Sequence, residues 1–287
     1  MPKIPENYQP LHDESLQTES SVVQGQAIDP LNHDKTQPIQ AHPIQPIQPI
    51  QEPLHGLTII NALTPLATRK KFISKVYSIL WFQLLVTSIF IGCCNQIKPL
   101  QKFMMSPAGT SIMLFCMIGV ISMTCCLYCM RDVIRKCPGN FLFLTTFTAC
   151  TTYMVGSAGI VYKLSTLLLA GLSTLGIFSG LSLYAVQTKY DYTDKGGYLL
   201  ACLLGFILFG FFISFTHYSV ASIVYSSIGS LIFSFYIVYD TQLIVGGEHR
   251  QIMFHTDDYV IAAISLYLDI INLFLMLLDL VSGSSRN

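Results

Sequence analysis

The hydrophobic positions of this chain form seven long runs that follow one another from residue 76 onward, separated by short polar connections. Each run is long enough to cross a hydrocarbon core about 30 Å thick. Apolar residues cover both faces of the runs, so the spans are read from length and flanking charge. The pattern predicts an all-α, polytopic membrane protein, a seven-transmembrane-helix bundle. The expected spans are residues 76–94, 108–130, 141–162, 164–186, 197–218, 220–245 and 259–282.

The connections between these runs are short, and the third and fourth runs meet at Lys163. Neighbouring helices are therefore expected to be antiparallel and in contact. The fourth run carries several small residues, among them Gly176 and Gly180 in a GxxxG spacing. Because small side chains let helices approach closely, we expect these glycines to pack inside the bundle. A seam between two copies of the chain is the alternative.

The first 65 residues have a different character, since they hold 10 of the 13 prolines and carry a net charge near minus five. A Pro-Ile-Gln repeat between residues 38 and 51 favours an extended polyproline backbone that cannot form a packed core. We therefore predict a disordered, cytosolic Pro/Gln-rich tail over residues 1–68 and a membrane domain over 69–287. We favour a solvated spacer for the tail over a docking site for a proline-reading module.

Basic residues flank the spans unevenly, with ten on the side of the tail and four on the other side. Cytosolic loops carry the excess of Lys and Arg, so the amino terminus is expected in the cytosol. Seven crossings would put the carboxyl terminus on the opposite side, whereas a re-entrant last run would return it to the cytosol. The ten are Arg69, Lys70, Lys71, Lys75, Arg131, Arg135, Lys136, Lys189, Lys195 and Arg250; the four are Lys98, Lys102, Lys163 and Arg286.

Composition excludes several classes of protein. Hydrophobic residues make up 52% of the chain and charged residues 11%, whereas about a quarter of residues are charged in soluble domains. A soluble enzyme, a secreted disulfide scaffold and a nucleic-acid binder are excluded. Cys126 and Cys129 form a lone CxxC without further zinc ligands, so small buried hydrophobes are the better interpretation. No nucleophile, base and orienting group converge, so we expect no enzyme and no cofactor.

Asp269 is a carboxylate deep inside an apolar run. It lies ten residues into the last span, about 15 Å along the helix axis and close to the bilayer centre. Facing lipid there, its charge would cost several kcal/mol, so the side chain is expected to face the bundle interior. At about 100° per residue, Ser265 and Asn272 share its helix face and form a polar stripe with it.

Asp240 lies near the cytosolic end of the sixth span, with Tyr236 one turn before it. The sixth and seventh spans run in opposite directions, so Asp240 and Asp269 are predicted to meet at a similar depth. Two carboxylates in a poorly solvated site share a proton, which makes the pair a candidate pH sensor and gate. Without the proton, repulsion parts the helices or the oxygens recruit calcium transiently. The alternative is that each aspartate separately bonds a backbone group or a basic side chain.

Arg131 and Arg135, at the cytosolic end of the second span, are the candidate basic partners of this pair. Both side chains are long enough to reach from a helix end toward the bundle interior. The favoured alternative is that they anchor their helix end at the lipid headgroups.

Four ordered blocks resemble the signature of the Bax inhibitor-1 family, in its lifeguard branch of transmembrane BAX inhibitor motif-containing proteins. The resemblance covers about residues 69–282, and several ordered blocks are more specific than one short pattern. One departure is Gly139, where many lifeguard members carry Trp, which affects the anchoring of the third span and leaves the aspartates untouched. The blocks are residues 72–80 (FISKVYSIL), 187–193 (QTKYDYT), 239–250 (YDTQLIVGGEHR) and 266–274 (LYLDIINLF).

The resemblance implies a bundle with the last helix central, residing in endoplasmic reticulum, Golgi or related membranes, with the plasma membrane as a further location. It also implies a pH-sensitive calcium leak, a role in suppressing cell death, and a di-aspartyl pH sensor at Asp240 and Asp269. Membrane lipid, calcium and protons are the expected partners, together with apoptosis-regulatory membrane proteins and no nucleic acid. Calcium is expected as the permeant ion.

Three function classes follow from these observations. A calcium leak or channel requires the aspartate pair to control cation flux. A membrane scaffold that modulates death-receptor or Bcl-2-type signalling requires the helices mainly as a platform. A seven-helix receptor requires an extracellular ligand surface, yet the loops on that side are short. We favour the leak, with the scaffold as its alternative.

Overall fold

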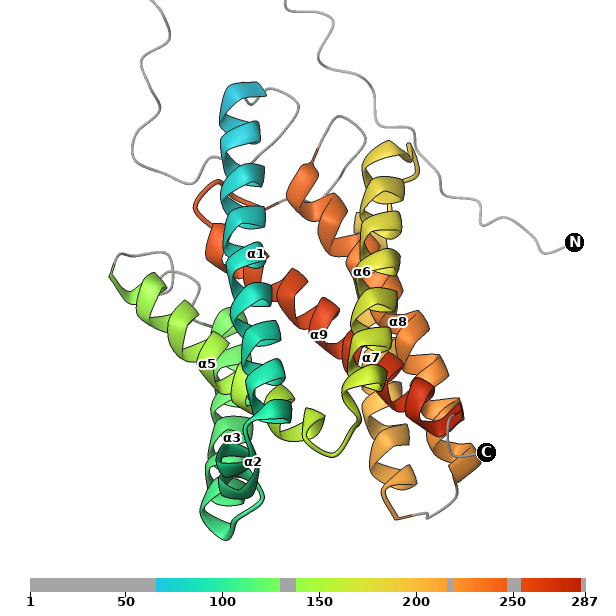
Figure 1. Ribbon diagram of the computed structural model, residues 1–287. Helices are drawn as coiled ribbons and strands as arrows, with labels where there is room; N and C mark the ends of the chain where they lie inside the picture. The colour runs from blue at the N-terminus through green and yellow to red at the C-terminus, as the bar shows by residue number, and fades with distance from the viewer. Residues whose placement is uncertain (1–65, 130–137, 216–218, 247–253, 285–287) are drawn as a thin grey trace, which may run out of the picture. The chain divides into compact units, whose positions relative to one another are not determined.

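A computed structural model describes residues 66–129, 138–215, 219–246 and 254–284 of the chain. All described helices belong to one compact unit that spans residues 54–287 (Figure 1). Seven of them are long and apolar enough to cross a membrane, which confirms the predicted all-α polytopic architecture. The elements are α1 (Leu66–Gln96), α2 (Lys98–Met104), α3 (Pro107–Cys129), α5 (Gly139–Gly159), α6 (Leu164–Gln187), the short 3-10 helix η1 (Thr193–Lys195), α7 (Gly196–Ile213), α8 (Ser219–Val245) and α9 (Tyr259–Ser284).

The helix boundaries differ from the predicted spans mainly at the start of the bundle. Helix α1 begins ten residues before the apolar run, so the basic residues from Arg69 to Lys75 are helical. Hydropathy detects only the part of a helix that lies in hydrocarbon, whereas backbone hydrogen bonding continues past that boundary. The short helix α2 was not predicted, because seven residues are too few to stand out by pattern. The predicted boundary at Lys163 is confirmed, since Lys163 is the N-cap of α6.

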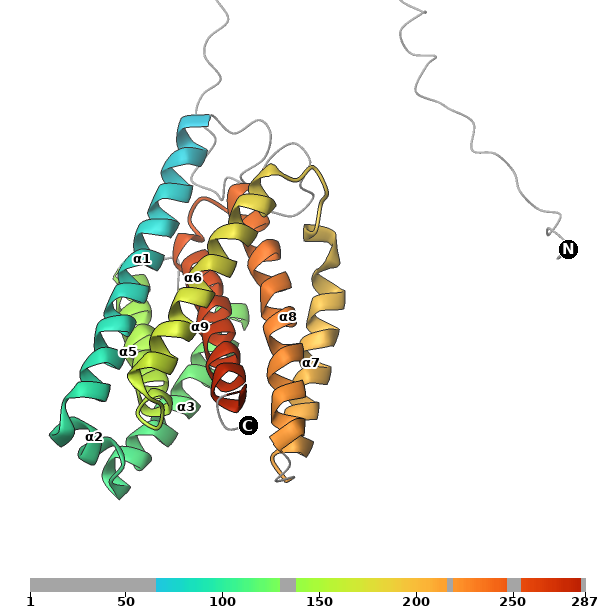
Figure 2. The ribbon, with the colours of Figure 1, turned by 45° about the vertical axis from the view of Figure 1, so that its right-hand side comes forward.

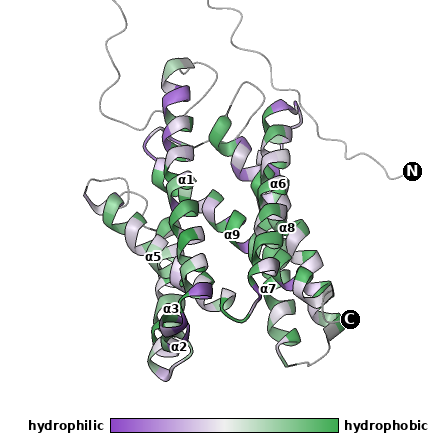
Figure 3. Cartoon of the chain, in the orientation of Figure 1, coloured by the Kyte–Doolittle hydropathy of each residue, from purple (hydrophilic) through white to green (hydrophobic). Residues whose placement is uncertain are grey.

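Helix α9 is the central helix of the bundle, as the family resemblance implied. Two thirds of its spanning segment (67%) is buried, against 39% or less in each of the other six spans. It crosses obliquely between α1 and α5 on one side and α6 and α8 on the other (Figures 1 and 2). The helices around it show mostly hydrophobic colour along their length (Figure 3), as expected for lipid-facing surfaces.

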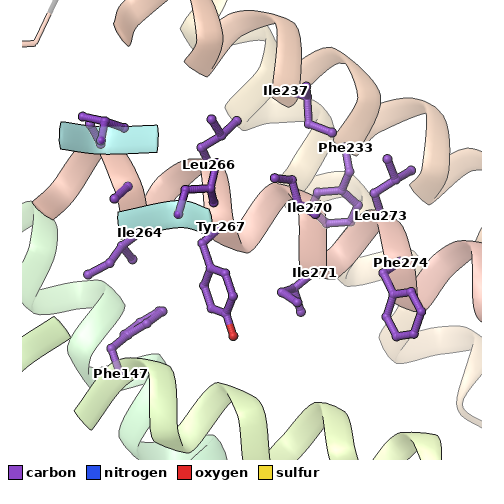
Figure 4. Close-up of a cluster of buried hydrophobic side chains, with 14 of the residues drawn as sticks. Phe147, Phe233, Ile237, Ile264, Leu266, Tyr267, Ile270, Ile271, Leu273 and Phe274 are labelled. Atoms are coloured by element: carbon purple, nitrogen blue, oxygen red, sulfur yellow. The ribbon is translucent and has the colours of Figure 1, made fainter. Parts of the chain in front are cut away.

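The side chains of α9 also form half of the main hydrophobic core. Ile264, Leu266 and Leu273 of α9 are fully buried, and they pack with Phe147 of α5 and Ile237 of α8 (Figure 4). Positions on opposite sides of α9 therefore contact different helices. The orientation of each α9 side chain is thereby fixed by its neighbours on both sides.

Glycines allow a close approach of helices at some positions only. A Cβ atom on Gly229 of α8 would lie 2.6 Å from Phe206 Cζ and 2.7 Å from Met276 Sδ, so α7, α8 and α9 meet there. By contrast, a Cβ atom on Gly176 or Gly180 would meet no described atom within 4 Å. The expected packing of these two glycines inside the bundle is therefore wrong, because α6 turns other residues toward its neighbours. Those buried residues of α6 are Leu167, Ala170, Thr174 and Ala185.

Candidate functional site

The structure brings Asp240 of α8 and Asp269 of α9 together inside the bundle. The two helices are antiparallel, since Gly229 lies against Met276 while Asp240, later in α8, meets the earlier Asp269. Each aspartate is only 7% exposed. Their carboxyl groups lie close enough to interact directly. Because two ionised carboxylates have no hydrogen to donate, a hydrogen bond between them needs a proton on one of them.

The pair lies next to other buried polar residues. Thr241 and Gln242, which follow Asp240, have no exposed surface. Among the residues that the structure describes, Asp269 Oδ2 has no hydrogen-bond partner. A second negative charge here would be weakly compensated, and charges at short distance interact strongly where solvent screening is low. One proton shared by two carboxyl groups is the arrangement that this geometry favours.

The end of α8 next to the pair is held by Arg69 of α1. The Arg69 guanidinium donates from Nε to the Val245 carbonyl at 2.6 Å and from Nη2 to the Gly246 carbonyl at 2.9 Å. Gly246 has a φ of 60°, the left-handed conformation that commonly ends a helix and that glycine adopts without steric cost. A cation at this position also complements the negative end of the α8 dipole. The sequence analysis used Arg69 only as one of the basic residues that predict a cytosolic amino terminus.

Gln242 ties the same turn of α8 to the connection between α6 and α7. Its Oε1 accepts from the Tyr192 backbone N–H at 2.8 Å, and its Nε2 donates to the Tyr190 carbonyl at 3.0 Å. A buried amide with both ends hydrogen-bonded fixes the backbone on either side. The turn that carries Asp240 is therefore held from α1 and from the α6–α7 connection.

Comparison with known proteins identifies the family. A family model described as "Inhibitor of apoptosis-promoting Bax1" matches residues 69–287. The chain belongs to the Bax inhibitor-1 family. Mouse "Protein lifeguard 3" is 28% identical to it over 221 residues, which are 75% of this chain and 70% of that protein. Mouse "Protein lifeguard 4" is 34% identical over 219 residues (76% and 87%), and "Protein LIFEGUARD 3" of Arabidopsis thaliana is 34% identical over 221 residues (75% and 85%). These relatives confirm the lifeguard branch.

The other predicted site residues of this lifeguard protein contribute less to the pair. Ser265 is half-buried, and Asn272 Nδ2 donates to the Leu268 carbonyl of its own helix at 2.9 Å. The Tyr236 ring packs near the rings of Phe233 and Tyr239, with centroids 6.4 and 6.5 Å away. Within the predicted polar stripe, Asn272 is thus hydrogen-bonded to the backbone of its own helix. The candidate basic partners, Arg131 and Arg135, lie outside the described residues.

A second carboxylate of α9 was missed by sequence reasoning. Asp279 Oδ2 accepts hydrogen bonds from the Ser222 hydroxyl at 2.7 Å and from the Ser226 hydroxyl at 2.5 Å. Both serines lie in the first two turns of α8, where the positive end of the helix dipole stabilises an anion. The spacing of the two serines, four residues apart on one helix face, was the available signal.

A separate polar network lies on the opposite side of α9 from the aspartate pair. The fully buried Tyr267 extends from α9 toward α5 (Figure 4). Its hydroxyl is hydrogen-bonded to Thr87 of α1 at 2.8 Å, and Thr87 is hydrogen-bonded to Thr152 of α5 at 2.9 Å. Interhelical hydrogen bonds of this kind hold membrane helices together. Tyr267 therefore anchors α9 to α1 and α5 on that side, while Asp269 faces α8.

No closed metal site is present in the described ranges. Groups of three or more His, Cys, Asp or Glu residues that could hold a metal ion are absent among the residues searched, which are the described ones.

Proposed function

We propose that this lifeguard protein is a pH-sensitive calcium leak of intracellular membranes, gated by the proton that Asp240 and Asp269 share. One observation carries the proposal: two buried carboxyl groups, from two antiparallel spanning helices, lie next to each other. Ionisable residues within membrane spans are costly, and a functional role is their default interpretation.

The gate follows from the charge of the pair. With one proton present, the shared hydrogen bond holds α8 against α9. Without it, two negative charges repel each other in a poorly screened interior, and separation of the helices or binding of a cation relieves the repulsion. Calcium prefers carboxylate oxygens, so the deprotonated pair favours its entry. The leak should therefore increase as the pH rises through the titration of the pair.

The remaining parts of the proposal concern location and physiology. We propose that the protein resides in endoplasmic reticulum or Golgi membranes, with its amino terminus in the cytosol, and that it suppresses cell death. The excess of basic residues on the side of the tail supports this orientation. The alternative is a scaffold that modulates death signalling without ion conduction. The family description supports this alternative in one respect, since the description names apoptosis and no ion.

Calcium flux into liposomes that contain the full-length protein tests the leak. Flux is measured between about pH 5 and pH 8 for the wild type, Asp240→Asn and Asp269→Asn. We expect either substitution to change the flux and its pH dependence together. Asp194→Asn is the matched control, because Asp194 is an exposed aspartate paired with Lys195. A wild type that conducts no calcium, or two Asn variants with wild-type profiles, would contradict the leak and favour the scaffold.

A further inference from the structure

A crevice opens on the outside of the bundle between α1 and α6. It has a volume of about 280 Å³, and α9 forms its floor with Ile270, Ile271 and Phe274. Gly92 of α1 and Gly171 of α6 line its walls. A Cβ atom on either glycine would meet no described atom within 4 Å, so each glycine borders open space. The missing side chains therefore contribute directly to the width of the crevice.

The crevice faces the hydrocarbon region of the membrane. It is lined by residues from the C-terminal half of one spanning segment, Ala67–Gln96, and from the N-terminal half of another, Leu164–Gln187. Three leucines of α6 that line it are also exposed on the surface of the bundle: Leu168 (57%), Leu172 (68%) and Leu175 (53%). The medium in contact with such a surface is lipid, because large exposed leucines within a span face acyl chains.

Three hydroxyl groups line the otherwise apolar crevice, and two of them, on Thr87 and Thr174, are hydrogen-bonded elsewhere; the third belongs to the exposed Ser88. The Thr174 hydroxyl donates to the Ala170 carbonyl of its own helix at 2.8 Å. The Thr87 hydroxyl belongs to the network with Thr152 and Tyr267. A polar ligand would gain no hydrogen bond from these two groups, whereas a hydrocarbon chain leaves no polar group unsatisfied. The chemistry of the lining therefore selects an apolar occupant.

We propose that this crevice binds one acyl chain of a membrane lipid. A second copy of the chain fits the observations less well, because Gly176 and Gly180, the α6 pair spaced for close helix approach, do not line the crevice. The bound chain contacts Ile270, which directly follows Asp269 on α9. Lipid in the crevice therefore contacts α9, the helix that carries Asp269.

Photo-crosslinking with a phosphatidylcholine that carries a diazirine on one acyl chain tests the site. The full-length protein is crosslinked in nanodiscs, and labelled peptides of α1, α6 and α9 are quantified. Gly92→Leu and Gly171→Leu fill the crevice. We expect a several-fold loss of label at the crevice, because each leucine fills space that the acyl chain would occupy and removes its van der Waals contacts there. Gly176→Leu and Gly180→Leu are matched controls, because these glycines also border open space but lie outside the crevice.

Wild-type labelling of the crevice that persists in both filled variants overturns the proposal, as does an equal loss in the controls. Dimers that a bifunctional crosslinker joins through the crevice also overturn it and identify a second copy as the occupant. Thermal unfolding of each variant shows whether that variant is folded. If one of the two filled variants is unfolded, the other alone is sufficient for the test. The assay measures lipid binding without calcium flux, so its result is independent of the proposed leak.

Discussion

Replacement of Arg69 by alanine is expected to free the end of α8 that lies next to the aspartate pair. The substitution removes two hydrogen bonds from a guanidinium to the Val245 and Gly246 carbonyls, at 2.6 and 2.9 Å. A hydrogen bond to a charged group contributes about 1.5 to 3 kcal/mol, but both bonds are only partly buried, and water replaces them in the variant. We therefore expect the free energy of opening of the last α8 turn to fall by about 2 kcal/mol.

Amide hydrogen exchange measures this opening. The Gly246 N–H donates to the Gln242 carbonyl at 2.9 Å, so its exchange reports the last turn of α8 directly. A loss of about 2 kcal/mol corresponds to exchange about 30-fold faster in a peptide that covers residues 240–246. Arg69→Lys should lie between wild type and Arg69→Ala, because lysine keeps the charge but lacks the planar fork.

Lys70→Ala is the control for this experiment, since Lys70 is the next residue of α1 and is exposed. Its exchange at residues 240–246 should equal that of the wild type. If Arg69→Ala and Lys70→Ala exchange at the same rate, Arg69 does not hold α8, and the helix end is fixed by Gln242 or by its own cap.

Two further predictions concern packing around α9. A double-mutant cycle of Thr87→Val and Tyr267→Phe, measured by unfolding titrations in mixed micelles, should give a coupling energy of about 0.6 to 1.7 kcal/mol. A coupling energy of zero would mean that the 2.8 Å hydrogen bond between the Thr87 and Tyr267 hydroxyls adds no stability. Gly229→Leu should destabilise the protein by about 1 to 3 kcal/mol in the same assay, because its side chain would overlap Phe206 and Met276. The control is Gly205→Leu, at a glycine that borders open space, which should change stability by less than about 0.5 kcal/mol. Equal losses of stability in Gly229→Leu and Gly205→Leu would contradict this account of the α7–α8–α9 contact.

The spans and the aspartate pair were predictable from the sequence for simple physical reasons. A membrane helix must be long and apolar, so a run of consecutive apolar residues indicates its position. A carboxylate inside such a run must avoid lipid, so Asp269 had to face inward. The antiparallel order of neighbouring spans then placed Asp240 at a similar depth. These inferences needed no knowledge of side-chain packing.

The features that were missed depend on the rotation and tilt of helices against each other. Gly176 and Gly180 carry a packing motif, yet α6 is rotated so that both border open space. Asp279 lies near the end of α9 and is held by hydroxyls of α8, an arrangement that appears only when the register of the two helices is known. Arg69 reaches a helix that lies 176 residues later in the chain. Hydropathy alone specifies none of these relations.

The central claim is that Asp240 and Asp269 share one proton, and infrared difference spectroscopy of the carboxyl C=O stretch tests it most directly. In a titration of the reconstituted protein between about pH 5 and pH 8, the wild type should lose the band of one protonated carboxyl group over the range in which the calcium flux changes. The double variant Asp240→Asn, Asp269→Asn should lack this band, and Asp279→Asn should retain it. A band of the same size in the double variant, or no titrating band in the wild type, would contradict the shared proton.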